Sequence, residues 1–155
     1  MKKTFLAILL LSGTAMLAQN SKTTRDRNQP SNDAPATVLQ AFQRDNPNIN
    51  NESWSQSNNQ WRANYNDDHN RNVDVYYDRN GIKGDTHTAW DNKDVPLNID
   101  GRVNSTYHAN GNYKTVRIDR PNNTALYQIK IQNGGKDHIV YLDEQGKKRK
   151  YNDHH

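Results

Sequence analysis

The chain contains no cysteine, which excludes disulfides, thiolate metal sites and a lipid-modified cysteine. Hydrophobic residues make up only 32% of its 155 residues, too few for a large single core. After residue 18, no hydrophobic run approaches the roughly 20 residues that a membrane-spanning helix needs. The composition therefore excludes a membrane channel, and packing alone has to stabilise the folded state.

The N-terminus has the layout of a secretory signal peptide. Lys2 and Lys3 precede the apolar run 5–11, and small residues follow up to Ala18. We expect a signal peptide over residues 1–18 and hence a periplasmic or secreted protein. Residues 19–35 carry one apolar side chain, Ala34, and are rich in Asn, Ser, Thr and Pro. Such a segment buries too little to offset the entropy of ordering, so we expect a flexible leader.

Signal cleavage also changes the charge of the protein. The formal net charge of the whole chain is +4, but removal of Lys2 and Lys3 leaves 19 basic against 17 acidic residues, a net charge of +2. This small excess does not provide the basic surface typical of a nucleic-acid-binding protein. We therefore expect no nucleic-acid partner, and no transmembrane span after cleavage.

The hydrophobic period changes three times along the chain, which predicts helix and strands in alternation. Val38, Leu39 and Phe42 form a helical stripe and predict a helix over about 35–45. Strands with a period of two follow between residues 52 and 90, and a second helix is expected over about 96–108. Four further strands are expected at about 112–119, 124–132 and 137–143 and after Gly146.

Two seven-residue segments suggest that the second half repeats the first. Residues 75–81 (VYYDRNG) and 140–146 (VYLDEQG) share four identities. The sequence therefore predicts an α+β fold of two tandem lobes, each a helix packed on an antiparallel sheet of about four strands. The lobes would cover residues 36–92 and 93–151, with 152–155 as a tail.

The order and spacing of these segments resemble the exported PepSY-like proteins, which share the fold of the β-lactamase inhibitor protein. The segments that carry the resemblance are 38–42, Trp54, 61–65, 75–81, 95–97 and 127–131. The resemblance covers about residues 36–151. It implies two tandem helix-and-sheet units and a binding or inhibitory role outside the cytoplasm, with no known chemistry for most members.

Catalytic and metal-binding patterns are weak in this sequence. The sequence has six histidines, and one of them, His69, follows two aspartates, Asp67 and Asp68. None of the histidines has the i, i+4 helical pairing or the Cys/His spacing that is typical of a set of metal ligands. There is no nucleophile elbow, phosphate loop or dinucleotide fingerprint. We therefore expect no enzyme, no metal and no cofactor.

Exposed side chains opposite the predicted core are the best candidates for a binding site. Tyr76 and Tyr141 occupy equivalent places in the two matching segments. The side chains expected on the same face are Arg62, Asn64, Asp74, Tyr76, Gln128, Lys130 and Tyr141. Tyr and Arg among polar residues are typical of recognition surfaces, but an antiparallel sheet also often leaves one face solvated.

The basic run Lys147–Lys150 allows two interpretations. It would dock to an acidic surface such as lipid headgroups or an anionic glycan, or it would protect an edge strand from pairing. The second is favoured, because the run falls where the last strand is expected.

The sequence thus predicts an exported, non-catalytic binding module. It would bind another exported protein, as an inhibitor of an envelope or extracellular enzyme. The alternative is a carbohydrate- or cell-envelope-binding protein, in which exposed aromatic rings stack on sugars.

Overall fold

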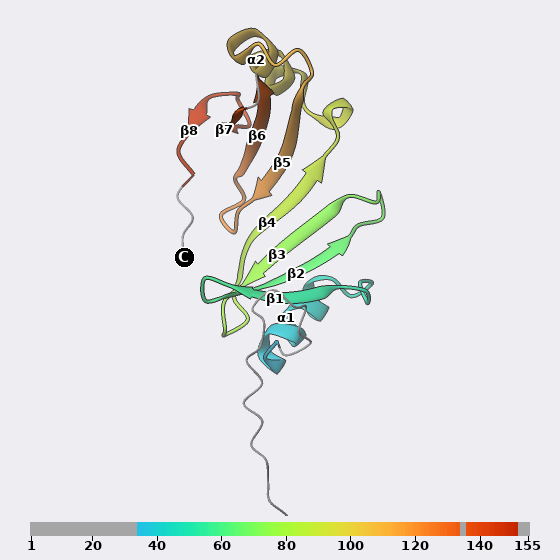
Figure 1. The fold of residues 1–155 in the computed structure, drawn as a ribbon. Helices are drawn as coiled ribbons and strands as arrows, with labels where there is room; N and C mark the ends of the chain where they lie inside the picture. The colour runs from blue at the N-terminus through green and yellow to red at the C-terminus, as the bar shows by residue number, and fades with distance from the viewer. Residues whose placement is uncertain (1–33, 134–135, 152–155) are drawn as a thin grey trace, which may run out of the picture.

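The computed structural model describes residues 34–133 and 136–151 and shows two helices on one eight-stranded antiparallel sheet (Figure 1). The elements are α1 (Ala36–Asp45), β1 (Ser53–Ser57), β2 (Gln60–Asn66), β3 (Asn72–Tyr77), β4 (Lys83–Trp90), the 3₁₀ turn η1 (Asn92–Asp94), α2 (Leu97–Tyr107), β5 (Tyr113–Asp119), β6 (Ala125–Asn133), β7 (Lys136–Asp143) and β8 (Lys148–Arg149). Within the described residues, α1 and α2 have 10 and 11 residues, and neither qualifies as a membrane-spanning helix. The signal peptide expected over 1–18 and the tail 152–155 lie outside the described residues.

The prediction of two tandem helix-and-sheet lobes is wrong, because the strands form a single sheet. They pair in chain order from β1 to β8, and β4 pairs with β5 from Thr86–Asp119 to Trp90–Thr115. Two separate four-stranded sheets would leave the edges of β4 and β5 with unpaired backbone amides and carbonyls. Their pairing satisfies these groups and makes the sheet continuous, although the helix and strand positions themselves agree closely with the periodicity.

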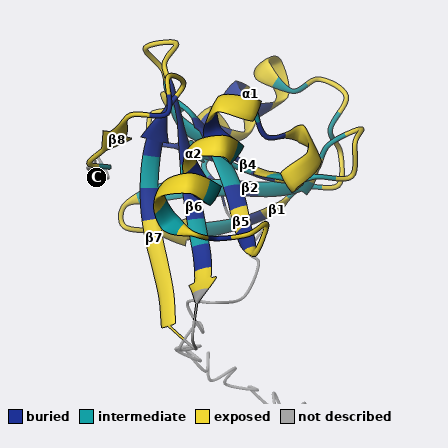
Figure 2. Ribbon diagram, turned by 90° about the horizontal axis from the view of Figure 1, so that it is seen from above, coloured by how far each residue is buried: buried dark blue, intermediate teal, exposed yellow. Residues whose placement is uncertain are grey.

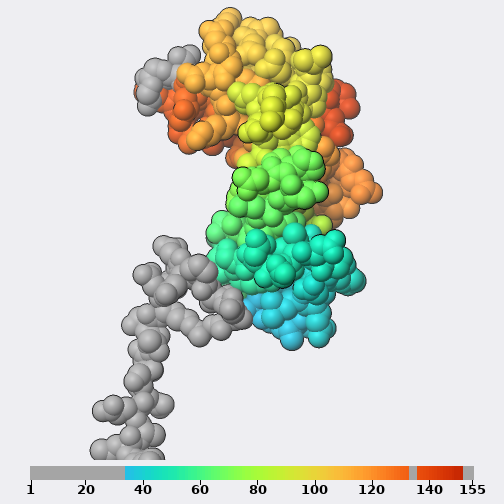
Figure 3. All heavy atoms as spheres, turned by 90° about the vertical axis from the view of Figure 1, so that its right-hand side faces the viewer, coloured from blue at the N-terminus to red at the C-terminus, as the bar shows by residue number. Residues whose placement is uncertain are grey.

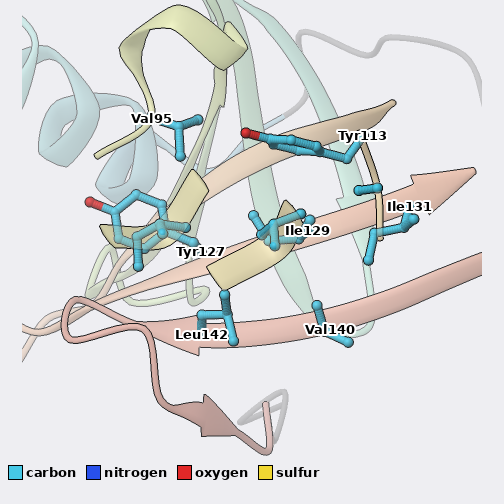
Figure 4. Packing of buried hydrophobic residues seen from close by; sticks show 10 residues of the cluster. Val95, Tyr113, Tyr127, Ile129, Ile131, Val140 and Leu142 are labelled. Atoms are coloured by element: carbon cyan, nitrogen blue, oxygen red, sulfur yellow. The ribbon is translucent and has the colours of Figure 1, made fainter. Parts of the chain in front are cut away.

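The hydrophobic core consists of two clusters on one face of the sheet, one under each helix. Alternation along the strands places apolar side chains on this face, which appears as buried segments beneath α1 and α2 in Figure 2. Under α1, Phe42 meets Trp54, Tyr65 and Tyr77 edge to face at centroid distances of 5.3–6.3 Å. Figure 4 shows the strand side chains of the α2 cluster gathered with Val95. The two ends of the described chain, blue around α1 and orange to red after α2, lie toward opposite ends of an elongated molecule (Figure 3).

Trp90 connects the two halves on this same face. Its ring packs edge to face on Tyr127 at 6.0 Å. The guanidinium groups of Arg71 and Arg117 stand 5.8 and 5.2 Å from its ring centroid, within the range of cation–π attraction. Arg71 precedes β3 and Arg117 lies on β5, so Trp90 joins residues from both sides of the β4–β5 pairing.

Two hairpin turns share one construction, headed by Asp78 and Asp143. In each, Oδ1 of the aspartate accepts hydrogen bonds from the backbone N–H groups two and four residues later. The residue three positions after the aspartate, Gly81 or Gly146, has a positive φ, which glycine adopts without steric cost. These are the turns that end the matching segments 75–81 and 140–146.

Each of these turns also docks on the first turn of a helix. Thr37 Oγ1 donates to the carbonyl of Arg79 (3.2 Å), and Asn98 Nδ2 donates to that of Glu144 (2.9 Å). Thr37 and Asn98 are the second residues of α1 and α2. At Gly81 the approach is closer, since a Cβ there would lie 2.7 Å from the carbonyl oxygen of Thr37. The turn chemistry therefore positions the helices as well as the strands.

Replacement of Gly81 should destabilise the protein more than replacement of Gly111. Both have a φ near +80° (79° and 77°), so alanine costs about 1–2 kcal/mol at either position. Gly111→Ala meets nothing within 4 Å, whereas Gly81→Ala forces the turn away from α1. We expect a further loss of about 1–3 kcal/mol for Gly81→Ala, measured by urea unfolding. Equal losses would show that the close approach to α1 carries no energy.

Asp143 should contribute stability that disappears in acid. Burial raises the pKa of this carboxyl, but the hydrogen bonds from Lys147 N–H, the Arg149 side chain and Gln145 N–H outweigh burial and bring the pKa below its ordinary value of 3.8. A lowered pKa gives stability that is complete above the pKa of the unfolded chain and is lost as the pH falls through that of the folded protein.

Asp143→Asn should therefore lower the unfolding free energy by a constant amount above about pH 5, and the difference should shrink below about pH 4. The control is Asp91→Asn, which removes a carboxylate with 74% of its side chain exposed. Urea unfolding at several pH values measures the unfolding free energies of both variants. If the difference between Asp143→Asn and the unsubstituted protein stays constant down to pH 2, the lowered pKa of Asp143 is contradicted.

Candidate functional site

All seven predicted binding residues lie on the face of the sheet opposite the helices, here called the free face. The strand register shows this directly, because Arg62 pairs with Tyr76, Asn64 with Asp74, and Gln128 with Tyr141. Each alternates along its strand with a core residue. The period of two thus places them correctly on one face, but it does not specify which of them meet.

The seven residues form two groups at different places on this face. In the first, Asn64 Nδ2 donates to Asp74 Oδ1 (2.8 Å), and Arg62 Nε lies 3.7 Å from the same oxygen. In the second, Gln128 Nε2 donates to the hydroxyl of Tyr141 (2.9 Å). Lys130 points its ammonium to Asp137 (2.6 Å) on the neighbouring strand.

His87 and Tyr151 join the two groups through a row of rings. The Tyr76 and His87 centroids lie 4.9 Å apart, His87 and Tyr151 6.2 Å, and Tyr151 stacks on Tyr141 at 5.1 Å. The Tyr151 hydroxyl donates to Asp85 Oδ2 (2.9 Å) and lies 3.3 Å from His87 Nε2. The chain after β8 therefore returns to β4 and brings the two equivalent tyrosines into one aromatic row.

The middle of the free face is not simply solvated. Ile118 and Leu126 belong to this face by register, next to His87, and both are buried (0% and 4% exposed). Tyr151 spans from Tyr141 to His87 on the same face. The burial of Ile118 and Leu126 contradicts the interpretation of a uniformly solvated face for this part of the sheet.

A hollow of about 440 Å³ opens at one end of the row of rings. A β-bulge shapes its floor, since Gly84 and Asp85 on β4 together oppose the single residue Tyr76 on β3. Bulges re-aim side chains, and the missing side chain at Gly84 leaves room. The lining residues are Ser57, Asn58, Gln60, Tyr76, Gly84, Asp85, His87, Arg120, Pro121, Asn122 and Tyr151.

Of the residues that line this hollow, the sequence prediction included only Tyr76. Gly84 within a strand pattern is a signal for a bulge, and alternation places Asp85 and His87 on one face, so part of the hollow was accessible to sequence reasoning. Arg120 and Tyr151 had no such signal, because a turn and the end of the chain meet β4 only through tertiary structure.

Asp67, Asp68 and His69 are the one group of possible metal ligands among residues 34–133 and 136–151. Asp67 is committed elsewhere, because its Oδ1 accepts from His69 N–H and Arg71 N–H and its Oδ2 lies 2.7 Å from the Arg71 guanidinium. Burial raises the pKa of Asp67, and the Arg71 and His69 hydrogen bonds more than reverse this and lower it. The geometry fits a turn closed by the Asp67–Arg71 ion pair. Apart from the proximity of these three side chains, nothing among the described residues points to a metal at this turn.

The basic run 147–150 contributes an edge strand. Lys148 and Arg149 form β8 and pair with Leu142 and Tyr141. Arg149 Nε also bonds Asp143 Oδ2 at 2.7 Å. The run therefore has a structural use at the edge of the sheet, as the favoured interpretation requires.

Comparison with known proteins gives the fold. No protein-family model matches the chain, and no curated protein matches its sequence. Among solved structures, a DUF2874 family protein from Bacteroides ovatus ATCC 8483 is 19% identical with a TM-score of 0.71, over 77% of this chain and 87% of that one. A protein from Bacteroides eggerthii DSM 20697, provisionally named as periplasmic, is 15% identical with a TM-score of 0.70, over 76% and 86%.

A BLIP-like protein from Bacteroides fragilis NCTC 9343 is 19% identical with a TM-score of 0.64, over 78% of this chain and 91% of that one. At these identities the likeness concerns the fold alone. The resemblance expected from the sequence is confirmed to this extent: the chain has a BLIP-like fold.

Proposed function

We propose that this protein is an exported, non-catalytic, PepSY-like binding module whose free face recognises another exported protein, as an inhibitor of an envelope or extracellular enzyme. The observation that carries the proposal is the row Tyr76–His87–Tyr151–Tyr141, flanked by polar side chains from both halves. Rigid aromatic rings with a polar rim are typical of the residues that dominate protein interfaces.

The shape of the molecule supports this use of the free face. Both α1 and α2 pack on the opposite face, so neither of these helices competes with a partner there. The side chains of the row are held by strands or by contacts to strands, which reduces the entropy lost on binding. The names of two neighbours, one BLIP-like and one provisionally periplasmic, agree with inhibition and export, as does the signal-peptide pattern of residues 1–18.

Site-specific photo-crosslinking tests this proposal. A crosslinking amino acid at position 130 on the free face should capture a protein from the envelope fraction of the source organism. The same amino acid at position 97, where Leu97 is 88% exposed on α2, should not. Tyr76→Ala/Tyr141→Ala should reduce the crosslink about tenfold or more, because interface aromatics often contribute 2 kcal/mol or more each.

Tyr107→Ala, which alters a partly buried tyrosine on the helix side, is the matched control, and circular dichroism verifies folding. Equal capture from positions 130 and 97, or a yield unaffected by the double substitution, would refute recognition by the free face.

A second function, binding of carbohydrate or another envelope component, is favoured by one specific observation. The hollow at the bulge combines aromatic rings with amide, carboxylate and guanidinium groups, and its volume lies in the range of small-ligand pockets. Sugars, with one apolar face and many hydroxyls, suit such a mixture.

A further inference from the structure

We propose that the hollow between Tyr76, Asp85 and Arg120 binds one pyranose ring that carries a carboxylate, as in an acidic glycan. This inference deepens the second function proposed above and rests on it. It assigns a ligand class to a place in the fold where aromatic, anionic and cationic side chains converge.

The bulge gives the hollow its depth. Gly84 lies opposite Tyr76, and a Cβ at Gly84 would come within 3.5 Å of the Tyr76 carbonyl oxygen. The hollow is bounded on one side by the β1–β2 turn at Asn58 and on the other by the β5–β6 turn at Asn122. Its volume of about 440 Å³ accommodates a single ring with its substituents.

The walls present flat rings to this space. Tyr76, His87 and Tyr151 all line the hollow and are all partly exposed. The C–H groups on one side of a pyranose ring carry slight positive charge, and they pack favourably on the negative face of an aromatic ring. Tyr141 and Arg120 already pack on the ring of Tyr151, so Tyr76 and His87 are the rings on which the pyranose would pack.

Arg120 supplies the cation for a carboxylate. Three arginines in the described part of the chain stack on aromatic rings, namely Arg71 and Arg117 on Trp90 and Arg120 on Tyr151, the last at 5.5 Å. Arg71 pairs with Asp67 and Arg117 with Asp119. Within residues 34–133 and 136–151, Arg120 has no carboxylate within 4.0 Å, so its stacked guanidinium can still donate two parallel hydrogen bonds to a ligand carboxylate.

Asp85 fixes the orientation of the ligand. Its Oδ2 accepts from the Tyr151 hydroxyl at 2.9 Å, and its other oxygen is a strong acceptor for sugar hydroxyls. A second carboxylate near Asp85 would be repelled. The ligand therefore directs hydroxyls toward Asp85 and its single carboxylate toward Arg120.

Protein-observed NMR titration tests this with the methyl glycosides of glucuronic and galacturonic acid and of the matching neutral sugars, glucose and galactose. At least one acidic glycoside should bind about tenfold more tightly than its neutral partner, since a charge-assisted bond adds 1.4 kcal/mol or more. The amide resonances of Gly84, Asp85 and Asn122 should shift on binding. In 0.5 M salt, the difference in affinity between the acidic and the neutral glycoside should become smaller, because salt screens the attraction between the two charges.

Arg120→Gln should abolish the preference for the acid and retain weak binding of the ring. Arg79→Gln removes the same charge from another exposed hairpin turn and should leave the preference intact, while the amide spectrum verifies that both variants fold. Equal binding of acidic and neutral sugars, or an unchanged preference in Arg120→Gln, would overturn the carboxylate assignment and leave carbohydrate binding standing. If none of the four glycosides shifts these resonances at high millimolar concentration, the carboxylate assignment and carbohydrate binding at the hollow are both overturned.

Discussion

The β4–β5 pairing is the interaction on which the rest of the structure depends. It joins the strands under α1 and those under α2 into one sheet, and it brings Arg71 of the first half and Arg117 of the second half within cation–π distance of Trp90. It also places His87 of β4 beside Ile118 of β5, so that Tyr151 can reach across the free face. Without this ladder, the aromatic row that connects Tyr76 to Tyr141 would not exist.

Because side chains alternate along the strands, the two faces of the sheet differ in composition and in role. One face supplies the apolar side chains that pack under α1 and α2, and the other therefore receives most of the polar and amphipathic residues. Because the hydrophobic fraction is small, most of the apolar side chains are needed for the stabilising clusters beneath the helices. Tyrosine and histidine, which are apolar in the ring and polar at the tip, then provide the contact area on the other face.

Much of this was predictable from the sequence. The period of two in residues 61–65 and 73–77, and the periodicity of residues 38–42, determined the elements and the faces, because burial of one face imposes that pattern. The similarity of segments 75–81 and 140–146 corresponds to turns with the same hydrogen bonds. It suggested separate lobes, however, because local similarity contains no information on whether β4 and β5 pair. The positions of Arg120 and Tyr151 in the hollow depend likewise on contacts between distant residues, which no local pattern encodes.

The order of the strands has a consequence for how the chain emerges during synthesis or export. The first half, up to Trp90, appears with the outer edge of β4 unpaired, and its partner β5 begins only at Tyr113. Residues 91–112, which include α2, must pass before that edge is closed, and an open edge invites pairing with other chains. Slow or interrupted passage through this interval is thus the moment at which the nascent protein is most exposed to aggregation.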